Sequence, residues 1–168
     1  MKRLVSGLLS GVFVFGFAFC SSLRPCQAIP PFKNEFFAVY VKESPSSPEE
    51  TSLAEAAGAK TGKCWVCHVN MSTRGEKKLG KKVRNNYGKA LSQFLKKDDF
   101  SSERRKAEPE EVKAEIREAL TKVEALKSDT NDSNSQTFGE LIASGKLPGN
   151  DEPDKEDLET AIKERDAS

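Results

Sequence analysis

The sequence predicts an all-α fold, because its apolar residues recur at helical spacing and its helix-start signals are clear. Apolar stripes with this spacing lie in residues 86–97 and 109–127. Helix-start signals occur at Ser47-Pro48-Glu49-Glu50 and at Thr137-Phe138-Gly139-Glu140, where a hydroxyl residue precedes a glutamate by three positions. With 168 residues, the chain is within the range of one domain.

The N-terminal segment, residues 1–28, has the pattern of a secretory signal peptide. Two basic residues precede an apolar run over residues 4–20, and the small-x-small pattern at residues 26–28 favours cleavage after Ala28. An uncleaved anchor is the first alternative, although the run is short for a membrane span and contains three glycines. Lipid attachment at Cys20 is the second alternative. We therefore expect a periplasmic or secreted protein, which contacts a membrane only if the leader is retained or lipidated.

The domain itself is expected at residues 29–149. Its predicted helices cover residues 32–41, 48–59, 86–97, 109–127 and a short segment from Thr137 that Gly145 stops. Residues 36–41 could instead form a buried strand, because periodicity does not settle a run this short. The stretch between His68 and Leu79 is polar, and Asp98-Asp99 with Ser101-Ser102 should end the third helix.

Beyond the domain, residues 150–168 form an acidic tail. We expect this tail to be mostly disordered, apart from a helical tendency near Leu158 and Ile162.

Residues 64–68, Cys-Trp-Val-Cys-His, match the C-x-x-C-H pattern of covalent c-type haem attachment. The thiols of Cys64 and Cys67 can add to the two vinyl groups of one haem, and His68 is then held under the iron as its axial ligand. Structural zinc is disfavoured because it needs four Cys or His ligands, while His68 is the only histidine and the other two cysteines lie in the leader. A thioredoxin-like dithiol would need a βαβ setting, which the pattern lacks. The prediction is one covalent haem c, with a Cys64–Cys67 disulfide or a chance match as alternatives.

The second axial position has no ligand that the sequence identifies. Met71 is the only methionine after the leader, and three residues from His68 it would lie on the proximal side of the haem. No second histidine exists, which leaves a lysine, an asparagine, Tyr87, water or no ligand. Neutral lysine is costly at neutral pH. We favour a five-coordinate or weakly ligated iron, with Tyr87 as a weak candidate for the distal ligand.

Charge is distributed unevenly along the chain. The full chain carries +1, but residues 74–106 hold 12 basic and 4 acidic residues, and residues 107–168 hold 8 basic and 17 acidic residues. The basic segment could dock a redox partner protein with an acidic surface. The alternative is a solvated face neutralised by the acidic C-terminal half. Export and the near-neutral charge disfavour nucleic-acid binding.

The motif at residues 64–68, together with residues 84–91 and 137–148, resembles small secreted bacterial cytochrome c-like domain proteins. The resemblance covers roughly residues 32–149. It implies an all-α, cytochrome c-like mono-haem domain that binds haem and transfers electrons. It assigns Cys64 and Cys67 as thioether anchors and His68 as the iron ligand, and it supplies no distal methionine.

Three polar residues of this resemblance, Arg84, Asn85 and Tyr87, could bind the haem propionates or line the distal face. We favour the alternative, in which Asn85 caps a helix and Tyr87 packs in the core. Trp65 is likewise expected to pack.

Three functions are consistent with these patterns. The first is a mono-haem electron carrier, which is not an enzyme. The second is an open-site haem protein that binds NO, CO or peroxide as a sensor or weak peroxidase. The third is a secreted interaction protein with a Cys64–Cys67 disulfide. We favour the electron carrier, and we expect its haem-free form to be marginally stable because the domain has few apolar residues.

Overall fold

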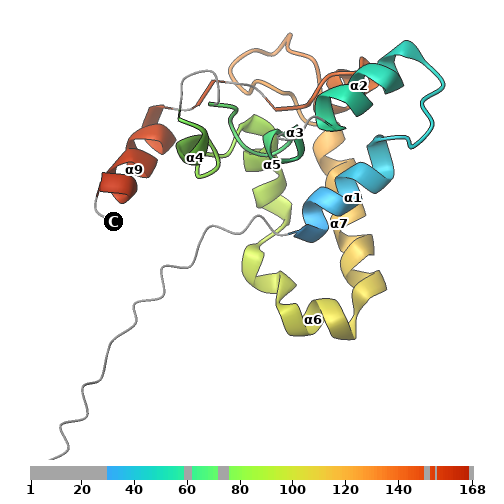
Figure 1. Ribbon diagram of the computed structural model, residues 1–168, viewed down its shortest axis with the longest axis horizontal. Helices are drawn as coiled ribbons and strands as arrows, with labels where there is room; N and C mark the ends of the chain where they lie inside the picture. The colour runs from blue at the N-terminus through green and yellow to red at the C-terminus, as the bar shows by residue number, and fades with distance from the viewer. Residues whose placement is uncertain (1–29, 59–61, 72–75, 150–151, 154, 167–168) are drawn as a thin grey trace, which may run out of the picture.

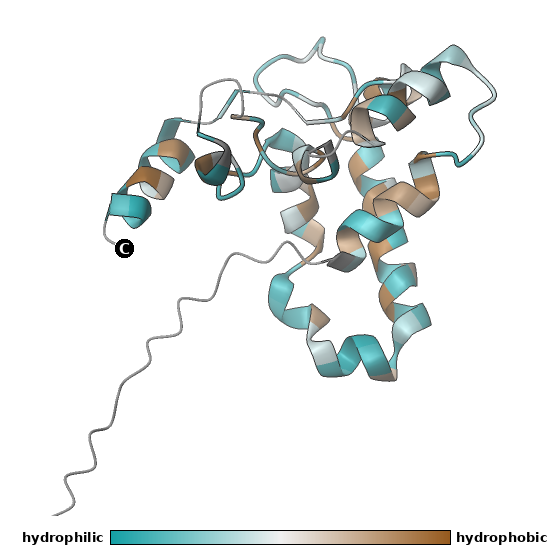
Figure 2. Cartoon of the chain, in the orientation of Figure 1, coloured by the Kyte–Doolittle hydropathy of each residue, from teal (hydrophilic) through white to brown (hydrophobic). Residues whose placement is uncertain are grey.

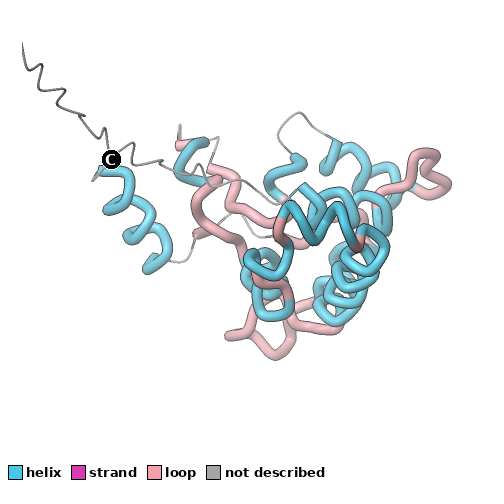
Figure 3. The backbone as a smooth tube through the Cα atoms, turned by 90° about the horizontal axis from the view of Figure 1, so that it is seen from below, coloured by secondary structure: helices cyan, strands magenta, loops and turns pink. Residues whose placement is uncertain are grey.

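The structure is a computed structural model that describes residues 30–58, 62–71, 76–149, 152–153 and 155–166. The predicted leader, residues 1–28, lies outside the described residues. Within the described part, the chain is mostly helical and contains only two isolated β-bridges (Figure 3). The all-α prediction is therefore confirmed for these residues. None of the helices described is long and apolar enough to cross a membrane.

Figure 1 shows the helices in their order along the chain. In order they are α1 (Pro30–Tyr40), α2 (Pro48–Gly58), α3 (Gly62–Trp65), α4 (Lys77–Gly80), α5 (Asn86–Phe94), the 3₁₀ helix η2 (Lys97–Phe100), α6 (Ser102–Ala107), α7 (Pro109–Glu124), α8 (Phe138–Ala143) and α9 (Lys155–Asp166). Residues 36–41, for which a strand was the alternative, are helical to Tyr40.

Helix α7 is the centre of the main core, because it contacts α1, α5, α6 and α8. Its predicted apolar stripe is buried, namely Val112, Ile116, Ala119, Leu120 and Val123. Figure 2 shows apolar residues concentrated on α1, α5 and α7. The Arg117 Nε atom also donates to the Glu35 carboxylate at 2.7 Å, which ties α7 to the buried polar edge of α1.

Local signals fix the ends of two helices as predicted. The Ser47 hydroxyl accepts a hydrogen bond from Glu50 N at 3.2 Å, which caps α2. At α8, Thr137 and Glu140 form a reciprocal capping box. Gly145 stops α8 with a φ of 80°, a conformation that favours glycine.

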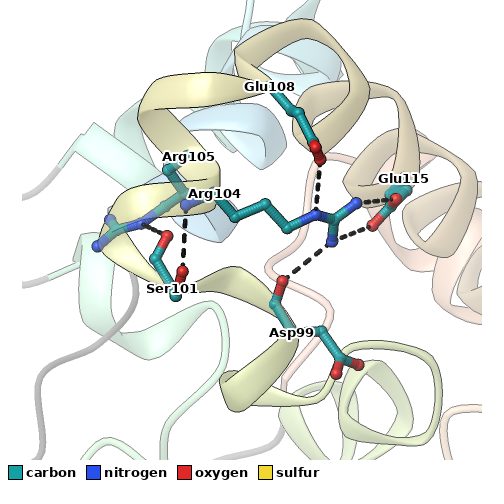
Figure 4. A network of polar contacts seen from close by, with 6 residues as sticks. All are labelled: Asp99, Ser101, Arg104, Arg105, Glu108 and Glu115. Carbon is teal, nitrogen blue, oxygen red and sulfur yellow. Dashed lines mark hydrogen bonds and ion pairs between the residues drawn. The ribbon is translucent and has the colours of Figure 1, made fainter.

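The segment between α5 and α7 departs from the prediction of a simple helix end. Instead, η2 and α6 form there, and Arg104 joins them to α7 (Figure 4). Its guanidinium donates to the Asp99 carbonyl at 2.9 Å and pairs with Glu108 and Glu115. These contacts span up to 11 residues, so they close the turn between α5 and α7.

The C-terminal tail corrects the prediction of disorder. Residues Lys155–Asp166 form α9, so the helical tendency near Leu158 and Ile162 is confirmed and the mostly disordered tail is wrong for this stretch. Helix α9 packs against α4, on the side of the molecule away from α1 and α7 (Figure 1). Its apolar residues cover a second core cluster, which consists of Val69, Met71, Leu79, Val83 and Ala161. This stretch is ordered because its few apolar side chains are buried against the second core cluster.

Candidate functional site

The C-x-x-C-H motif forms a single compact turn at the end of α3. The Cys64 carbonyl accepts hydrogen bonds from Cys67 N at 3.4 Å and from His68 N at 3.1 Å. Both cysteines are free, and each residue is partly exposed. The turn therefore gathers two unpaired thiols and the imidazole within five residues.

His68 is held by the segment that precedes α5. Its backbone forms an isolated antiparallel β-bridge with Arg84. The neighbouring Val69 N donates a hydrogen bond to the Val83 carbonyl at 3.1 Å. The ring Nδ1 lies 3.3 Å from the same carbonyl. Because a carbonyl oxygen can only accept, Nδ1 must carry the proton in this contact, and Nε2 is then the nitrogen with a lone pair. This arrangement orients a histidine for metal ligation.

The electrostatics around His68 favour its neutral form. Burial lowers the pKa of His68 below its usual value, and the nearby charges of Arg84 and Lys81 lower it further, while the contact with Val83 opposes these effects. A neutral imidazole is the form that binds a metal. The pKa of the Cys67 thiol is raised to about 12, mainly by burial, so this sulfur is a thiol rather than a thiolate in the haem-free chain.

Asn85 connects α5 to the motif through one buried side chain, which is 1% exposed. Its Nδ2 donates to the carbonyls of Trp65, Val66 and His68 at 2.9, 3.2 and 3.1 Å. Its backbone N donates to the Cys67 carbonyl at 3.1 Å. Its Oδ1 accepts from Gly88 N at 2.9 Å and so caps α5. The prediction of helix capping by Asn85 is confirmed, and its contacts with the motif are the functional feature that the sequence did not reveal.

Two glycines allow the close approach of α5 to the motif and of residues 147–149 to Asn85. A Cβ at Gly88 would lie 2.1 Å from the Cys67 carbonyl oxygen, and a Cβ at Gly149 would lie 1.8 Å from Asn85 Nδ2. Only a residue without a side chain allows α5 to approach the motif and the 147–149 segment to cover Asn85. The sequence marks neither glycine as special, because the partners of each are distant in the chain.

The aromatic residues near the motif pack, as expected. Trp65 is 5% exposed and Tyr87 is fully buried, with its ring 5.8 Å from that of Phe36 and 5.2 Å from that of Phe138. Burial is the main cause that raises the pKa of Tyr87, so its phenol stays protonated. Met71 lies in the second core cluster with Val69 and Val83. The structure therefore gives Tyr87 and Met71 core positions.

The donor set fits a covalent haem on the His68 side. It consists of two free thiols on one turn and a neutral imidazole whose Nδ1 is already engaged. In addition, Trp65 Nε1 and Tyr87 Oη are buried without a hydrogen-bond partner among the described residues. Buried donors without a hydrogen-bond partner are rare in native protein cores.

An open groove of about 370 Å³ lies elsewhere, between α1, α2 and α8. Val39, Leu53 and Ile142 line it, together with polar side chains, and no residue of the motif does. The C-x-x-C-H motif and this groove are thus separate features.

No protein family, curated protein or solved structure matched this chain in comparisons with known proteins. A function for this chain must therefore be inferred from the residues of the site alone.

Proposed function

We propose that this chain is an exported mono-haem c-type cytochrome that transfers single electrons. Cys64 and Cys67 would hold the haem by thioether bonds, and His68 would be the axial ligand of the iron. The observation that best supports this proposal is the contact between His68 Nδ1 and the Val83 carbonyl, which leaves Nε2 available on a histidine directly after the second thiol.

When bound, the haem supplies a one-electron iron couple. The protein's own residues perform the other tasks. The thiols of Cys64 and Cys67 would hold the haem, each adding its S–H across the double bond of one vinyl group. Val83 keeps the imidazole in the tautomer that can bind iron, and the neutral state of His68 removes competition from a proton.

The partner in this proposal is a redox protein with an acidic surface. Lys78, Lys81, Lys82 and Arg84 are exposed, and their side chains make no ion pair within the described part of the chain. Two of them, Lys81 and Arg84, are close enough to His68 to lower its pKa. Positive charge beside the site would attract and orient an acidic partner and so raise the rate of encounter.

A second candidate is an open-site haem protein that binds NO, CO or peroxide. It is favoured because neither a histidine nor a methionine is available as distal ligand, since His68 is the only histidine and Met71 is buried in the second core cluster. An iron with one axial position free binds small ligands directly.

The test is a visible spectrum of the oxidised and the reduced protein after co-expression with a c-type maturation system and denaturing extraction of loose haem. Retained haem with sharp reduced α and β bands supports the electron carrier. Retained haem with a broad high-spin spectrum that sharpens under CO supports the ligand binder. The variant with Cys64→Ser and Cys67→Ser should lose the haem, whereas Met71→Leu should keep it. No haem on the wild-type chain would refute the proposal, and a mass two hydrogens lower would then indicate a Cys64–Cys67 disulfide.

A further inference from the structure

We propose that Asn85 is a positioning residue, which folds the 64–68 turn into its final shape before any haem is attached. In the same proposal, residues 147–149 hold the Asn85 side chain in place. The role of the turn in haem attachment rests on the proposed function, but the effect of Asn85 on the turn does not.

The carbonyl groups of the turn depend on Asn85 for their hydrogen bonds. The carbonyls of residues 65–68 all accept from it, three from the side-chain nitrogen and one from the backbone nitrogen. The Nδ2 group has only two hydrogens, so one of them is shared between two carbonyls, and this single residue is the donor to four successive carbonyls. Buried carbonyls without partners are strongly disfavoured, so the turn depends on this residue for its conformation.

The amide of Asn85 has a fixed orientation. Its oxygen accepts from Gly88 N at 2.9 Å, so its nitrogen must face the turn. Helix α5 is in turn fixed to the main core, because it contacts α7. The helical core therefore positions the amide.

The amide is also covered by the segment that closes the domain. Gly149 approaches so closely that a Cβ would lie 1.8 Å from Nδ2 and 2.5 Å from Cγ of Asn85. Pro148 beside it is buried. Gly149 therefore leaves the Asn85 side chain no room to move away from the turn in its direction.

A turn fixed in this way presents both thiols and the imidazole together in the haem-free chain. Groups held in reacting geometry need less ordering when they react. We therefore expect Asn85 to affect how much haem becomes attached, although it touches neither sulfur atom in these contacts.

The test is Asn85→Asp in the full-length chain expressed without haem. The substitution is nearly isosteric and keeps an oxygen that can cap α5, because Asp is as good an N-cap as Asn. It replaces the donor nitrogen by an oxygen that faces three carbonyl oxygens. Asn131→Asp is the matched control, because it adds the same charge in the exposed loop before α8.

Two measurements on the haem-free chain decide the proposal. Trp65 is the only tryptophan and its carbonyl accepts from Asn85, so its fluorescence reports on the turn directly. For Asn85→Asp we expect a red-shifted emission and roughly tenfold faster amide hydrogen exchange at Cys67 and His68, with α7 unchanged. The control should match the wild type. Unchanged emission and exchange for Asn85→Asp would overturn the proposal.

If Asn85→Asp also loses protection in α7, then Gly149→Ala replaces it, because Asn85 itself is retained. It should shift the Trp65 emission in the same direction, and a wild-type emission would overturn the proposal. Haem retention, measured separately after maturation, distinguishes the two failures. A wild-type chain without haem refutes the proposed function alone, whereas a wild-type chain with haem and an unaffected turn in the variants refutes the role of Asn85 alone.

Discussion

Gly88→Ala is the substitution that tests most directly how α5 supports the motif. The added Cβ would lie 2.1 Å from the Cys67 carbonyl oxygen and 3.0 Å from its carbonyl carbon. Both atoms belong to the backbone, so no side chain can rotate away. To reach even 3.0 Å from the oxygen, α5 and the turn must separate by about 0.9 Å.

This separation has a calculable cost. It would lengthen the distance from Asn85 N to the Cys67 carbonyl from 3.1 Å to about 4.0 Å, which no longer forms a hydrogen bond. The three Nδ2 contacts, at 2.9 to 3.2 Å, would be lost in the same way. Three N–H hydrogens make these four contacts, so three hydrogen bonds at about 0.5–1.5 kcal/mol each give roughly 1.5–4.5 kcal/mol, reduced by about 0.5–1 kcal/mol because alanine favours helix over glycine. A change of this size is a large part of the stability of a small domain.

The assay is urea unfolding of the haem-free chain, followed by circular dichroism and by Trp65 fluorescence. The matched control is Gly58→Ala in α2, where a Cβ would meet nothing within 4 Å. We expect the control to be neutral or slightly stabilising. If Gly88→Ala unfolds at the same urea concentration as the control, with the same Trp65 emission, the contact between α5 and the turn is not what holds the motif.

Four further predictions concern the core, the surface and the Cys67 thiol. Phe138→Ala should lower the free energy of unfolding by about 3–5 kcal/mol in urea titrations, because Phe138 is 2% exposed and fills the core beside α5. In the haem-loaded protein, reversing Lys81 and Lys82 to Glu should slow oxidation by an anionic iron complex about tenfold at low salt, with little effect at high salt, whereas Lys106→Glu on α6 should have a smaller effect. Since the pKa of Cys67 rises from 9.0 to about 12 on folding, the folded haem-free chain should lose stability as the pH rises from about 9 toward 12, because the unfolded chain releases this proton first. The same shift should slow alkylation of Cys67 near pH 8.5 by on the order of 10³ relative to the chain in urea.

The long helices could be predicted because their signals are local. The apolar residues that mark α7 in the sequence recur every three or four positions, and the structure buries them against α1 and α5. Helices η2 and α6 could not be predicted in this way, since they are short and lack an apolar stripe. Arg104 stabilises them through contacts with Glu115 and the Asp99 carbonyl, and nothing in the local sequence shows that these groups meet.

Helix α9 could not be predicted from amino-acid composition. Its acidic sequence predicts disorder, because it has little apolar surface to bury. The few apolar residues it has, Leu158, Ala161 and Ile162, nevertheless lie on the second core cluster, which residues 69–83 supply. Two ion pairs, between Lys89 and Asp157 and between Arg165 and Glu76, flank this contact. Whether such a tail folds depends on a partner surface far earlier in the chain, such as Glu76, which lies 89 residues before Arg165, and composition does not reveal it.

The C-x-x-C-H motif was recognised from its spacing alone. Of the hydrogen bonds by which Asn85 holds the motif, only some could be predicted from the sequence. The amide oxygen binds Gly88 N three residues later, and this is a local preference of asparagine before a helix. The amide nitrogen binds carbonyls 17 to 20 residues earlier, and no periodicity connects those positions. The two interactions are coupled, however, because an amide whose oxygen faces the helix must direct its nitrogen to the other side. The capping preference of asparagine therefore determines the orientation of the Asn85 amide nitrogen. That the 64–68 turn lies in front of this nitrogen could be learned only from the folded structure.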